Sequence, residues 1–184
     1  MINPDNFIDW LNEARITRFV GVPDSVLKSL SSAIERHSGC EDHVISANEG
    51  AAVGYAVGSY IESSRPACVY LQNSGLGNAL NPLLALAHRG VYGSPMLLIV
   101  GWRGEPGHPD ERQHLEQGRI TQELLDSANV PYVILSDNEK LAKVQIRRLL
   151  EEMTSSPGPV AILIRQGTFE SGDSVFFGVE SLEL

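Results

Sequence analysis

Glu49 lies between two segments whose composition suggests a functional site. The preceding residues 43–47 have the pattern of a buried strand, and the following residues 50–58 form a helical pattern rich in glycine and alanine. Small side chains let another backbone approach closely, so we interpret this helix as an interface helix. A carboxyl group in that place is a candidate for acid–base chemistry. Position alone, however, favours a first-turn acid that interacts with the helix dipole.

A glycine-bearing turn follows the apolar residues 67–72. Gly75 and Gly77 stand two positions apart before a predicted helix, and backbone N–H groups in such a turn can surround an anion or another ligand. The segment is not the dinucleotide-binding pattern, because Leu80 occupies the place of the third glycine, and no Gly-Lys-Ser/Thr of a P-loop follows. A tight turn between a strand and a helix explains the same residues about as well.

Two basic residues near these segments could bind an anionic ligand. Arg103 lies at the end of a predicted strand, in a loop rich in glycine and proline, and its guanidinium could bind a tetrahedral anion through two hydrogen bonds. Lys28 comes one helical turn after Asp24, on the same helix face. Arg103 could equally be a solvated surface charge, and for Lys28 that explanation is favoured.

Strand and helix patterns alternate along the whole chain. The predicted strands are residues 18–22, 43–47, 67–72, 95–101, 132–135 and 160–165. The predicted helices are one that starts at Pro4 with Asn3 as its N-cap, and then about 24–37, 49–62, 121–128 and 138–153, the last capped by Asp137 or Asn138. A glycine-bearing turn at 74–81 is expected to lead into a further helix that ends at Ala87. Short apolar strands without polar alternation belong in a sheet that is covered on both faces. The sequence therefore predicts an α/β fold, a three-layer sandwich with about six parallel strands.

Further expectations concern the ends of the chain and one loop. In the first helix, Phe7, Ile8, Leu11 and Ala14 are expected to share the buried face. Residues 102–111, with several glycines and prolines, are expected to form a long loop. Residues 1–169 are expected to form one domain, followed by a C-terminal tail at 170–184.

Polar or glycine residues follow four of the predicted strands at the point where each strand ends. These segments are residues 22–24, 47–49, 72–75 and 101–103. Ligands of parallel α/β sheets bind at the carboxyl ends of the strands. The convergence of the four segments therefore predicts a ligand site at that edge of the sheet.

Composition limits the classes of function. The chain has 184 residues, of which 42% are hydrophobic and 20% charged, which excludes a disordered or collagen-like protein. The longest apolar stretch is far shorter than the ~20 residues of a membrane-spanning helix. The net charge of −9 argues against nucleic acid or an anionic membrane as the main partner, but a few local cations can still bind a small anionic substrate. Cys40 and Cys68 form no metal or redox motif, and no signal peptide is visible, so a cytoplasmic protein is expected.

Four sequence blocks, each at a predicted strand end, carry a family resemblance. Residues 21–25, 47–52, 72–78 and 101–107 occur in order and together resemble the pyrimidine-binding domain of the thiamine-diphosphate-dependent 2-oxo acid decarboxylases. Within that family the chain resembles the phosphonopyruvate decarboxylases, and it also resembles the alpha subunit of the sulfopyruvate decarboxylases. The resemblance extends from about residue 5 to about Phe169.

The resemblance implies roles for two carboxyl groups. Glu49 matches the glutamate that activates the cofactor through a hydrogen bond to N1′ of its aminopyrimidine ring. Asp24 matches an acidic residue that assists proton transfer at the reacting centre, although an ordinary N-cap explains it equally well. Several pyruvate decarboxylases use a His-His pair for proton transfer. This chain has no such pair, so the resemblance does not identify its proton donor.

The resemblance also implies binding residues. The cofactor pocket is expected to be lined by Glu49, Asn73, Ser74, Gly75 and Asn78, although turn chemistry also accounts for the polar residues among them. The substrate, a small 2-oxo acid with a second anionic group, is expected to contact Arg103, Lys28, Gln113 and His114. The implied reaction converts 3-phosphonopyruvate to phosphonoacetaldehyde and carbon dioxide, and the sequence does not separate a phosphonate from a sulfonate.

One family motif is missing from the chain. The diphosphate-binding half of the family carries Gly-Asp-Gly, which helps to hold Mg²⁺ and the diphosphate, whereas this chain has only Gly172-Asp173-Ser174. The resemblance therefore implies either an isolated domain or one subunit of a split enzyme, in which a beta subunit supplies the Mg²⁺ site and the two chains form a hetero-oligomer. Two other readings compete with it, namely a non-catalytic flavodoxin-like binding module and a carboligase similar to acetolactate synthase. Glu49 with both glycine loops favours catalysis over the binding module, and residues 101–107 and 73–78 favour decarboxylation over ligation.

Overall fold

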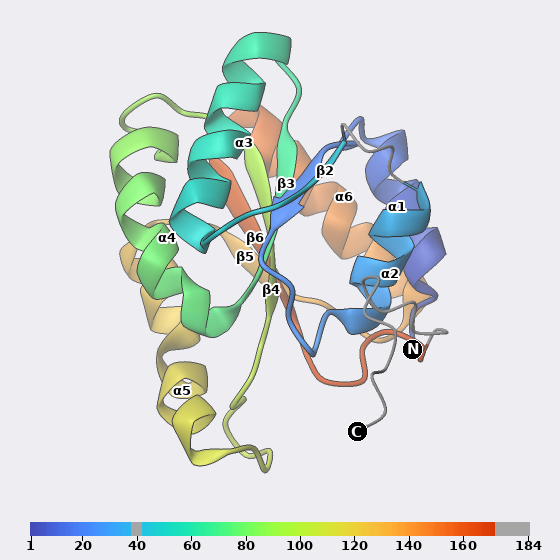
Figure 1. The fold of residues 1–184 in the computed structure, drawn as a ribbon. Helices are drawn as coiled ribbons and strands as arrows, with labels where there is room; N and C mark the ends of the chain where they lie inside the picture. The colour runs from blue at the N-terminus through green and yellow to red at the C-terminus, as the bar shows by residue number, and fades with distance from the viewer. Residues whose placement is uncertain (38–41, 172–184) are drawn as a thin grey trace, which may run out of the picture.

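The computed structural model describes residues 1–37 and 42–171, which form a parallel sheet with helices on both faces (Figure 1). The strands are β1 Phe19–Gly21, β2 His43–Ile45, β3 Ala67–Gln72, β4 Met96–Gly101, β5 Tyr132–Ile134 and β6 Pro159–Ile164. The helices are α1 Pro4–Glu13, α2 Lys28–His37, α3 Glu49–Ser63, α4 Leu76–Pro82, α5 Arg112–Ser127 and α6 Glu139–Ser155. A 3₁₀ turn, η1 Asn73–Gly75, precedes α4, and a π turn, η2 Leu83–Ala87, follows it. The predicted α/β sandwich with six parallel strands is confirmed.

The sheet separates two hydrophobic cores. Helices α1, α2 and α6 cover one face, and α3, α4 and α5 cover the other (Figure 1). Consecutive residues of the central strands point to opposite faces, so that Leu97 and Ile99 of β4 pack under the first group and Leu98 and Val100 under the second. Burial on both faces explains why β3, β4 and β6 are apolar along almost their whole length.

The strand order is β2-β1-β3-β4-β6-β5. The chain runs outward from β1 to β2 on one side and from β3 to β4 on the other, so β1 and β3 flank the point where the direction of winding reverses. Ligands of open parallel sheets bind at such a point, outside the carboxyl ends of the strands. The order also makes β2, β1, β3 and β4 neighbours, and these are the four strands whose ends carry the polar segments.

Local capping sets the ends of several helices. The side chain of Asn3 accepts hydrogen bonds from the backbone N–H of Asp5 at 2.8 Å and of Asn6 at 3.3 Å, and Pro4 occupies the first helical position. Asn138 caps α6 in the same way through the N–H of Leu141 at 3.2 Å. The predicted cap Asn3 is therefore confirmed, and of the two candidates for α6, Asp137 and Asn138, the cap is Asn138.

Four predicted details were wrong. Helix α2 begins at Lys28 rather than near residue 24, because the Asp24 carboxylate turns the preceding residues by accepting backbone N–H bonds. Helix α5 begins at Arg112 rather than 121, because its first half is polar and gives no apolar periodicity. Ala14 is exposed, since α1 ends at Glu13 and Trp10 lies in the core instead. The strand predicted at 43–47 is the short edge strand β2 and is only partly buried.

The last described residues return to the start of the chain. The ring of Phe169 meets that of Phe7 edge-on at 5.2 Å, and the N–H of Glu170 donates to the carbonyl of Ile2 at 2.9 Å. The predicted tail segment from Gly172 onward lies outside the described residues, as does Cys40. Within residues 1–37 and 42–171, the structure has no helix long and apolar enough to span a membrane.

Candidate active site at the carboxyl ends of the strands

Asp24 follows β1 and lies buried against the end of β4. The residue is 8% exposed, and its Oδ2 accepts hydrogen bonds from the N–H groups of Val26 at 2.9 Å and Leu27 at 3.2 Å. A Cβ atom added to Gly101 would lie 2.2 Å from that Oδ2, so only glycine leaves room for the carboxyl group there. The other oxygen, Oδ1, is buried without a hydrogen-bond partner among the described residues.

Burial controls the protonation of Asp24. Loss of water raises the pKa of its carboxyl group above the usual value, and the backbone hydrogen bonds and the nearby charge of Arg103 offset only part of this effect. A buried polar atom without a partner destabilises a fold by about 1–3 kcal/mol. Such a group, at the edge where ligands of these sheets bind, is a candidate for proton transfer.

Glu49 is the first residue of α3, and its carboxylate lies against the turn that follows β3. Oε2 accepts a hydrogen bond from the side-chain amide of Asn78 at 2.8 Å. A Cβ atom added to Gly75 would lie 2.3 Å from Oε1, so the glycine forms a cradle for the carboxylate. A Cβ atom added to Gly50 would lie 2.9 Å from the carbonyl oxygen of Asn78, which shows how closely the starts of α3 and α4 pack.

Asn73 holds two loops of the site together. Its side-chain Nδ2 donates to the carbonyl of Arg103 and to Oγ1 of Thr121, both at 2.9 Å, and its Oδ1 accepts from the N–H of Arg103 at 3.0 Å. The residue is 1% exposed, and both amide protons are used within the protein. Its observed contacts therefore position the loop after β4. The neighbouring Ser74 is half-buried, and its hydroxyl accepts from the side chain of Gln72 at 2.7 Å.

Arg103 is held by an acid from its own loop. Its Nε lies 2.9 Å from Oδ2 of Asp110 and its Nη2 lies 2.5 Å from Oδ1, while Nη1 donates to the hydroxyl of Ser25 at 3.0 Å. This ion pair lowers the pKa of Asp110 well below its usual range and raises that of Arg103. Asp110 therefore occupies the Nε–Nη2 edge of the guanidinium. The second N–H of Nη2 and the N–H groups of Nη1 face away from that carboxylate, and Nη1 already binds Ser25, so an anion would have to bind at this second edge.

A hollow of about 590 Å³ opens beside this ion pair. Its lining includes Ser25, Trp102, Arg103 and Arg165. Arg165 is paired with Glu105 at 2.7 Å. The indole N–H of Trp102 donates to the carbonyl of Gly118 in α5 at 2.9 Å, which fixes one wall of the hollow.

The remaining predicted substrate residues lie at the margin. Gln113 is exposed in the first turn of α5 and donates to Glu111, and Nε2 of His114 lies 3.9 Å from a carboxylate oxygen of Glu111. The backbone of His114 packs against Gly104, where an added Cβ would lie 2.0 Å from its carbonyl oxygen. Lys28 is exposed at the start of α2. In the part of the chain that the structure describes, no hydrogen bond or ion pair links Gln113 or His114 to Asp24 or Glu49.

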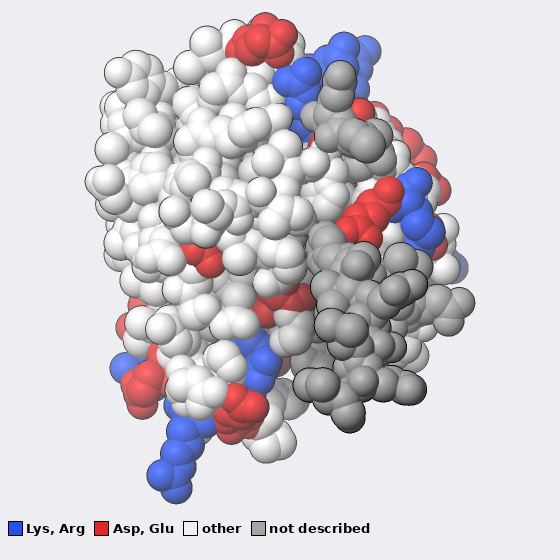
Figure 2. All heavy atoms as spheres, in the orientation of Figure 1, with Lys and Arg blue, Asp and Glu red and all other residues white. Residues whose placement is uncertain are grey.

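The surface over α3 and α4 carries few charges. Figure 2 shows a broad, almost uncharged area over these two helices, and large apolar side chains are exposed on α3, β2 and the π turn: Ile45, Tyr55, Ile61, Leu84 and Leu86. Contiguous exposed apolar surface marks interaction sites. Glu49 begins one of these helices, so the candidate site borders this surface.

Sequence reasoning missed several residues that build the site. Asp110 and Ser25 bind the Arg103 side chain, Thr121 binds Asn73, and Gly101 makes room for Asp24. An acid seven positions after an arginine in a glycine-rich loop was a usable signal for Asp110. Nothing in the sequence pairs Thr121 with Asn73, because they are distant in the chain. No group of three or more His, Cys, Asp or Glu side chains suited to a metal ion exists among the described residues.

Comparison with known proteins identifies the family of the chain. Residues 4–129 match the family "Thiamine pyrophosphate enzyme, N-terminal TPP binding domain". The chain is 30% identical over 167 residues to phosphonopyruvate decarboxylase of Streptomyces viridochromogenes, which covers 91% of this chain and 41% of the relative. It is also 30% identical over 122 residues to sulfopyruvate decarboxylase subunit alpha of Methanococcus maripaludis, covering 66% of this chain and 70% of that subunit. The chain thus spans less than half the length of the first relative.

A solved structure shows the same fold. The benzoylformate decarboxylase of Polynucleobacter necessarius superimposes with a TM-score of 0.65 at 16% identity, over 100% of this chain and 33% of that enzyme. This likeness concerns the fold, since so low an identity carries no information on substrate. The family match covers the four strand-end segments that position Asp24, Glu49, Asn73 and Arg103. The chain belongs to the thiamine pyrophosphate enzymes, whose N-terminal TPP-binding domain its residues 4–129 form.

Proposed function

We propose that this chain is the pyrimidine-binding half of a thiamine-diphosphate-dependent decarboxylase that converts 3-phosphonopyruvate to phosphonoacetaldehyde and carbon dioxide. The observation that carries the proposal is the Glu49 carboxylate, fixed by Asn78 and cradled by Gly75 at the carboxyl edge of the sheet. The similarity to phosphonopyruvate decarboxylase over 91% of the chain supports the choice of substrate. Sulfopyruvate is the alternative substrate, supported by the alpha-subunit relatives.

The residues at the edge fit the proposed cofactor. One oxygen of the Glu49 carboxyl group accepts a hydrogen bond from Asn78. The other oxygen lies beside Gly75, which has no side chain to displace it. We assign Glu49 the task of holding a proton at N1′ of the aminopyrimidine ring, with Ser74, Gly75 and Asn78 lining the pocket and Asn73 positioning its loop. Thiamine diphosphate, when bound, supplies the carbon nucleophile and accepts the electron pair left by carbon dioxide.

Asp24 is assigned the transfer of a proton near the reacting atoms. Its burial raises its pKa, so a larger share of the group keeps its proton near neutral pH than is usual for an aspartate. Its unpartnered Oδ1 is the atom that could give or take that proton. Since the chain has no His-His pair, Asp24 is the acid that we propose in that role.

The proposal includes a second chain. Relatives named as subunit alpha support a beta subunit, and the sequence lacks the Gly-Asp-Gly that would hold Mg²⁺ and the diphosphate. We propose that the partner packs on the uncharged surface over α3 and α4, next to Glu49. Tight cofactor binding and turnover would then require both chains.

The test is reconstitution. The purified chain alone should release carbon dioxide from 3-phosphonopyruvate at no more than the background rate in the presence of thiamine diphosphate and Mg²⁺. Addition of a diphosphate-binding chain that carries Gly-Asp-Gly should restore release, and sulfopyruvate assayed in parallel decides between the two substrates. Robust turnover by the single chain would refute the split enzyme, and carbon–carbon ligation without aldehyde release would identify a carboligase instead.

Arg103 provides a prediction about substrate selection. With its other edge on Asp110, the guanidinium can give one charged hydrogen bond to the second anion of the substrate, and such a bond typically contributes about 1.5–3 kcal/mol. In the assembled enzyme, Arg103→Ala should therefore raise KM for 3-phosphonopyruvate about ten- to hundredfold, at 1.4 kcal/mol per tenfold change. The KM for pyruvate, which lacks the second anion, should change little in steady-state kinetics.

Two comparisons control this experiment. Arg119→Ala removes an exposed arginine of α5 that pairs with Glu116 at 3.1 Å, and it should leave both KM values unchanged. Lys28→Ala tests the other predicted cation. If Arg103→Ala raised KM equally for pyruvate and phosphonopyruvate, Arg103 would serve only to close its loop on Asp110.

A further inference from the structure

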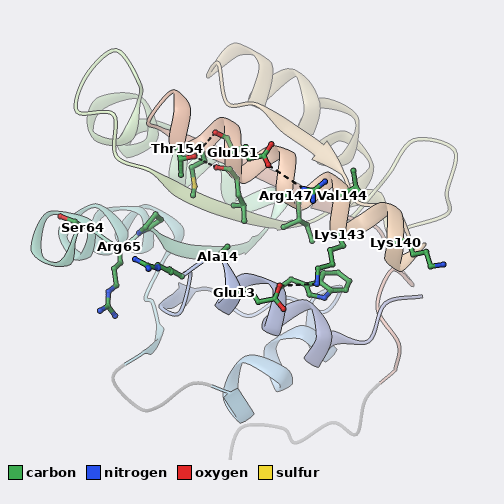
Figure 3. Close-up of a pocket in the computed structure, with 16 residues that line it drawn as sticks. Glu13, Ala14, Ser64, Arg65, Lys140, Lys143, Val144, Arg147, Glu151 and Thr154 are labelled. Carbon is green, nitrogen blue, oxygen red and sulfur yellow. Dashed lines mark hydrogen bonds and ion pairs between the residues drawn. The ribbon is translucent and has the colours of Figure 1, made fainter.

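A groove of about 850 Å³ lies away from the candidate site, on the face of the sheet covered by α1 and α6. Figure 3 shows it between α6, the end of α1 and the connection from α3 to β3. Trp10 of α1, with Leu150 and Met153 of α6, forms part of an apolar floor. Val144, on the turn of α6 beside this floor, is 37% exposed. Trp10, Leu150 and Met153 are at most 8% exposed, so the uncovered apolar surface of the groove includes Val144 and only the edges of these floor residues.

Positive charge gathers at this groove in an otherwise acidic chain. Five of the 14 basic residues line it: Arg15, Arg65, Lys140, Lys143 and Arg147. Two carboxylates lie among them. Glu13 pairs with Lys143 at 3.4 Å and Glu151 with Arg147 at 3.9 Å, as the dashed lines in Figure 3 mark. Arg15, Arg65 and Lys140 form no ion pair with any residue that the structure describes.

Backbone conformation at the groove is unusual. Arg15, just beyond α1, and Ser64, just beyond α3, have φ values of 63° and 55°, and both line the groove. Glycine is the relaxed residue at such helix ends, since the left-handed conformation costs other residues about 1–2 kcal/mol. An arginine at this position places a guanidinium on the rim in spite of that cost. Asn129, which lies beyond α5 and away from the groove, has a similar φ of 50°, so the conformation is a helix ending and its consequence here is the placement of Arg15 at the groove.

We propose that this groove docks an acidic amphipathic segment of a partner protein, with aliphatic side chains on the floor and carboxylates against Arg15, Arg65 and Lys140. Charge complementarity carries the choice of partner, because the groove holds an excess of cations in a chain whose net charge is −9. An amphipathic helix that lays its apolar face into a groove between helices is a common mode of recognition. The surface is separate from Glu49 and Asp24, so docking there is independent of the proposed chemistry.

A designed peptide tests the proposal on the full chain. The probe is a fluorescein-labelled helical peptide of about 14 residues, about 20 Å long, with Leu at i, i+3, i+4 and i+7 and Glu at flanking positions. Fluorescence anisotropy should show saturable binding that weakens with salt. The same peptide with Gln in place of Glu should bind at least about tenfold more weakly. Equal affinity of the two peptides would overturn the assigned charge chemistry.

Matched variants locate the binding. The double variant Arg15→Glu/Arg65→Glu should weaken the acidic peptide about tenfold or more, since two attractions become repulsions. Val144→Asp should weaken peptide binding by placing a charge on the exposed apolar surface beside the floor. Arg119→Glu, on α5 at the opposite face of the sheet, is the control and should bind as the wild type does. Circular dichroism checks that each variant is folded, and unchanged affinity in folded floor and rim variants would refute the groove as the site.

Other occupants give distinct results. A dimer in sedimentation that Arg15→Glu/Arg65→Glu disperses would assign the groove to a second copy of the chain. Displacement of the peptide by inorganic pyrophosphate at low concentration would assign it to a small anion. Tighter peptide binding by Glu180→Gln/Glu183→Gln, which alters only the acidic C-terminal residues of the sequence, would point to the chain's own end as competitor. Each of these results would refute the proposal that the groove binds an acidic segment of a partner protein.

Discussion

Glu49→Gln should slow exchange of the C2 proton of thiamine diphosphate by about 10²–10⁴ in the assembled enzyme, the usual effect of losing a positioned acid–base group. The amide keeps the shape of the side chain and can still accept the hydrogen bond from Asn78, which measures 2.8 Å in the wild type. It cannot hold or release a proton at N1′ of the aminopyrimidine ring. Exchange measured by NMR in deuterium oxide reports this step directly, before any substrate is added.

Two further variants separate chemistry from structure. Glu62→Gln changes the exposed glutamate at the other end of α3, which pairs with Arg18 at 3.2 Å, and it should exchange at the wild-type rate. Gly75→Ala places a methyl group 2.3 Å from the position of Oε1, so the carboxylate must move, and exchange should slow although every acid is still present. Wild-type exchange in Glu49→Gln would show that Glu49 is only a first-turn acid of α3.

The sequence was sufficient for the architecture because burial on both sheet faces leaves a strong signal. Strands β3, β4 and β6 are apolar along nearly their whole length, and each was predicted within one residue at either end. The predicted bounds were less accurate where the apolar pattern is weaker. Helix α5 has a polar first half, and β2 lies at the sheet edge, where fewer of its side chains are buried.

The site was predictable only in part. The parallel topology brings the carboxyl ends of neighbouring strands together, so the four polar segments could be placed at one edge before any contact was known. The partners of each side chain could not be placed. The pairing of Arg103 with Asp110 depends on how a glycine-rich loop folds back, and the bond between Asn73 and Thr121 depends on the packing of α5 against the turn after β3. Neither leaves a periodic pattern in the sequence.

Asp24→Asn should lower the turnover of the assembled enzyme, and it should make the free energy of unfolding of the isolated chain less sensitive to pH. Burial raises the pKa of the wild-type carboxyl above the unfolded value of 3.8, so the folded protein binds the proton more tightly than the unfolded chain does. The stabilisation from this proton is complete below the unfolded pKa and is lost as the pH rises through the folded pKa. Asparagine does not ionise, and its amide oxygen can still accept from the N–H groups of Val26 and Leu27.

The measurement is the free energy of unfolding in urea at several pH values between about 4 and 8, for wild type, Asp24→Asn and the exposed control Asp126→Asn. The stability of Asp24→Asn relative to wild type should rise as the pH increases from the unfolded pKa to the raised folded pKa and then level off, while Asp126→Asn shows no such trend. Carbon dioxide release should fall by about 10²–10⁴ in Asp24→Asn alone. A gain in stability at neutral pH together with a loss of turnover is the signature of a residue kept buried for its chemistry. Full turnover in Asp24→Asn would show that Asp24 only caps the turn before α2, through the hydrogen bonds that its Oδ2 accepts.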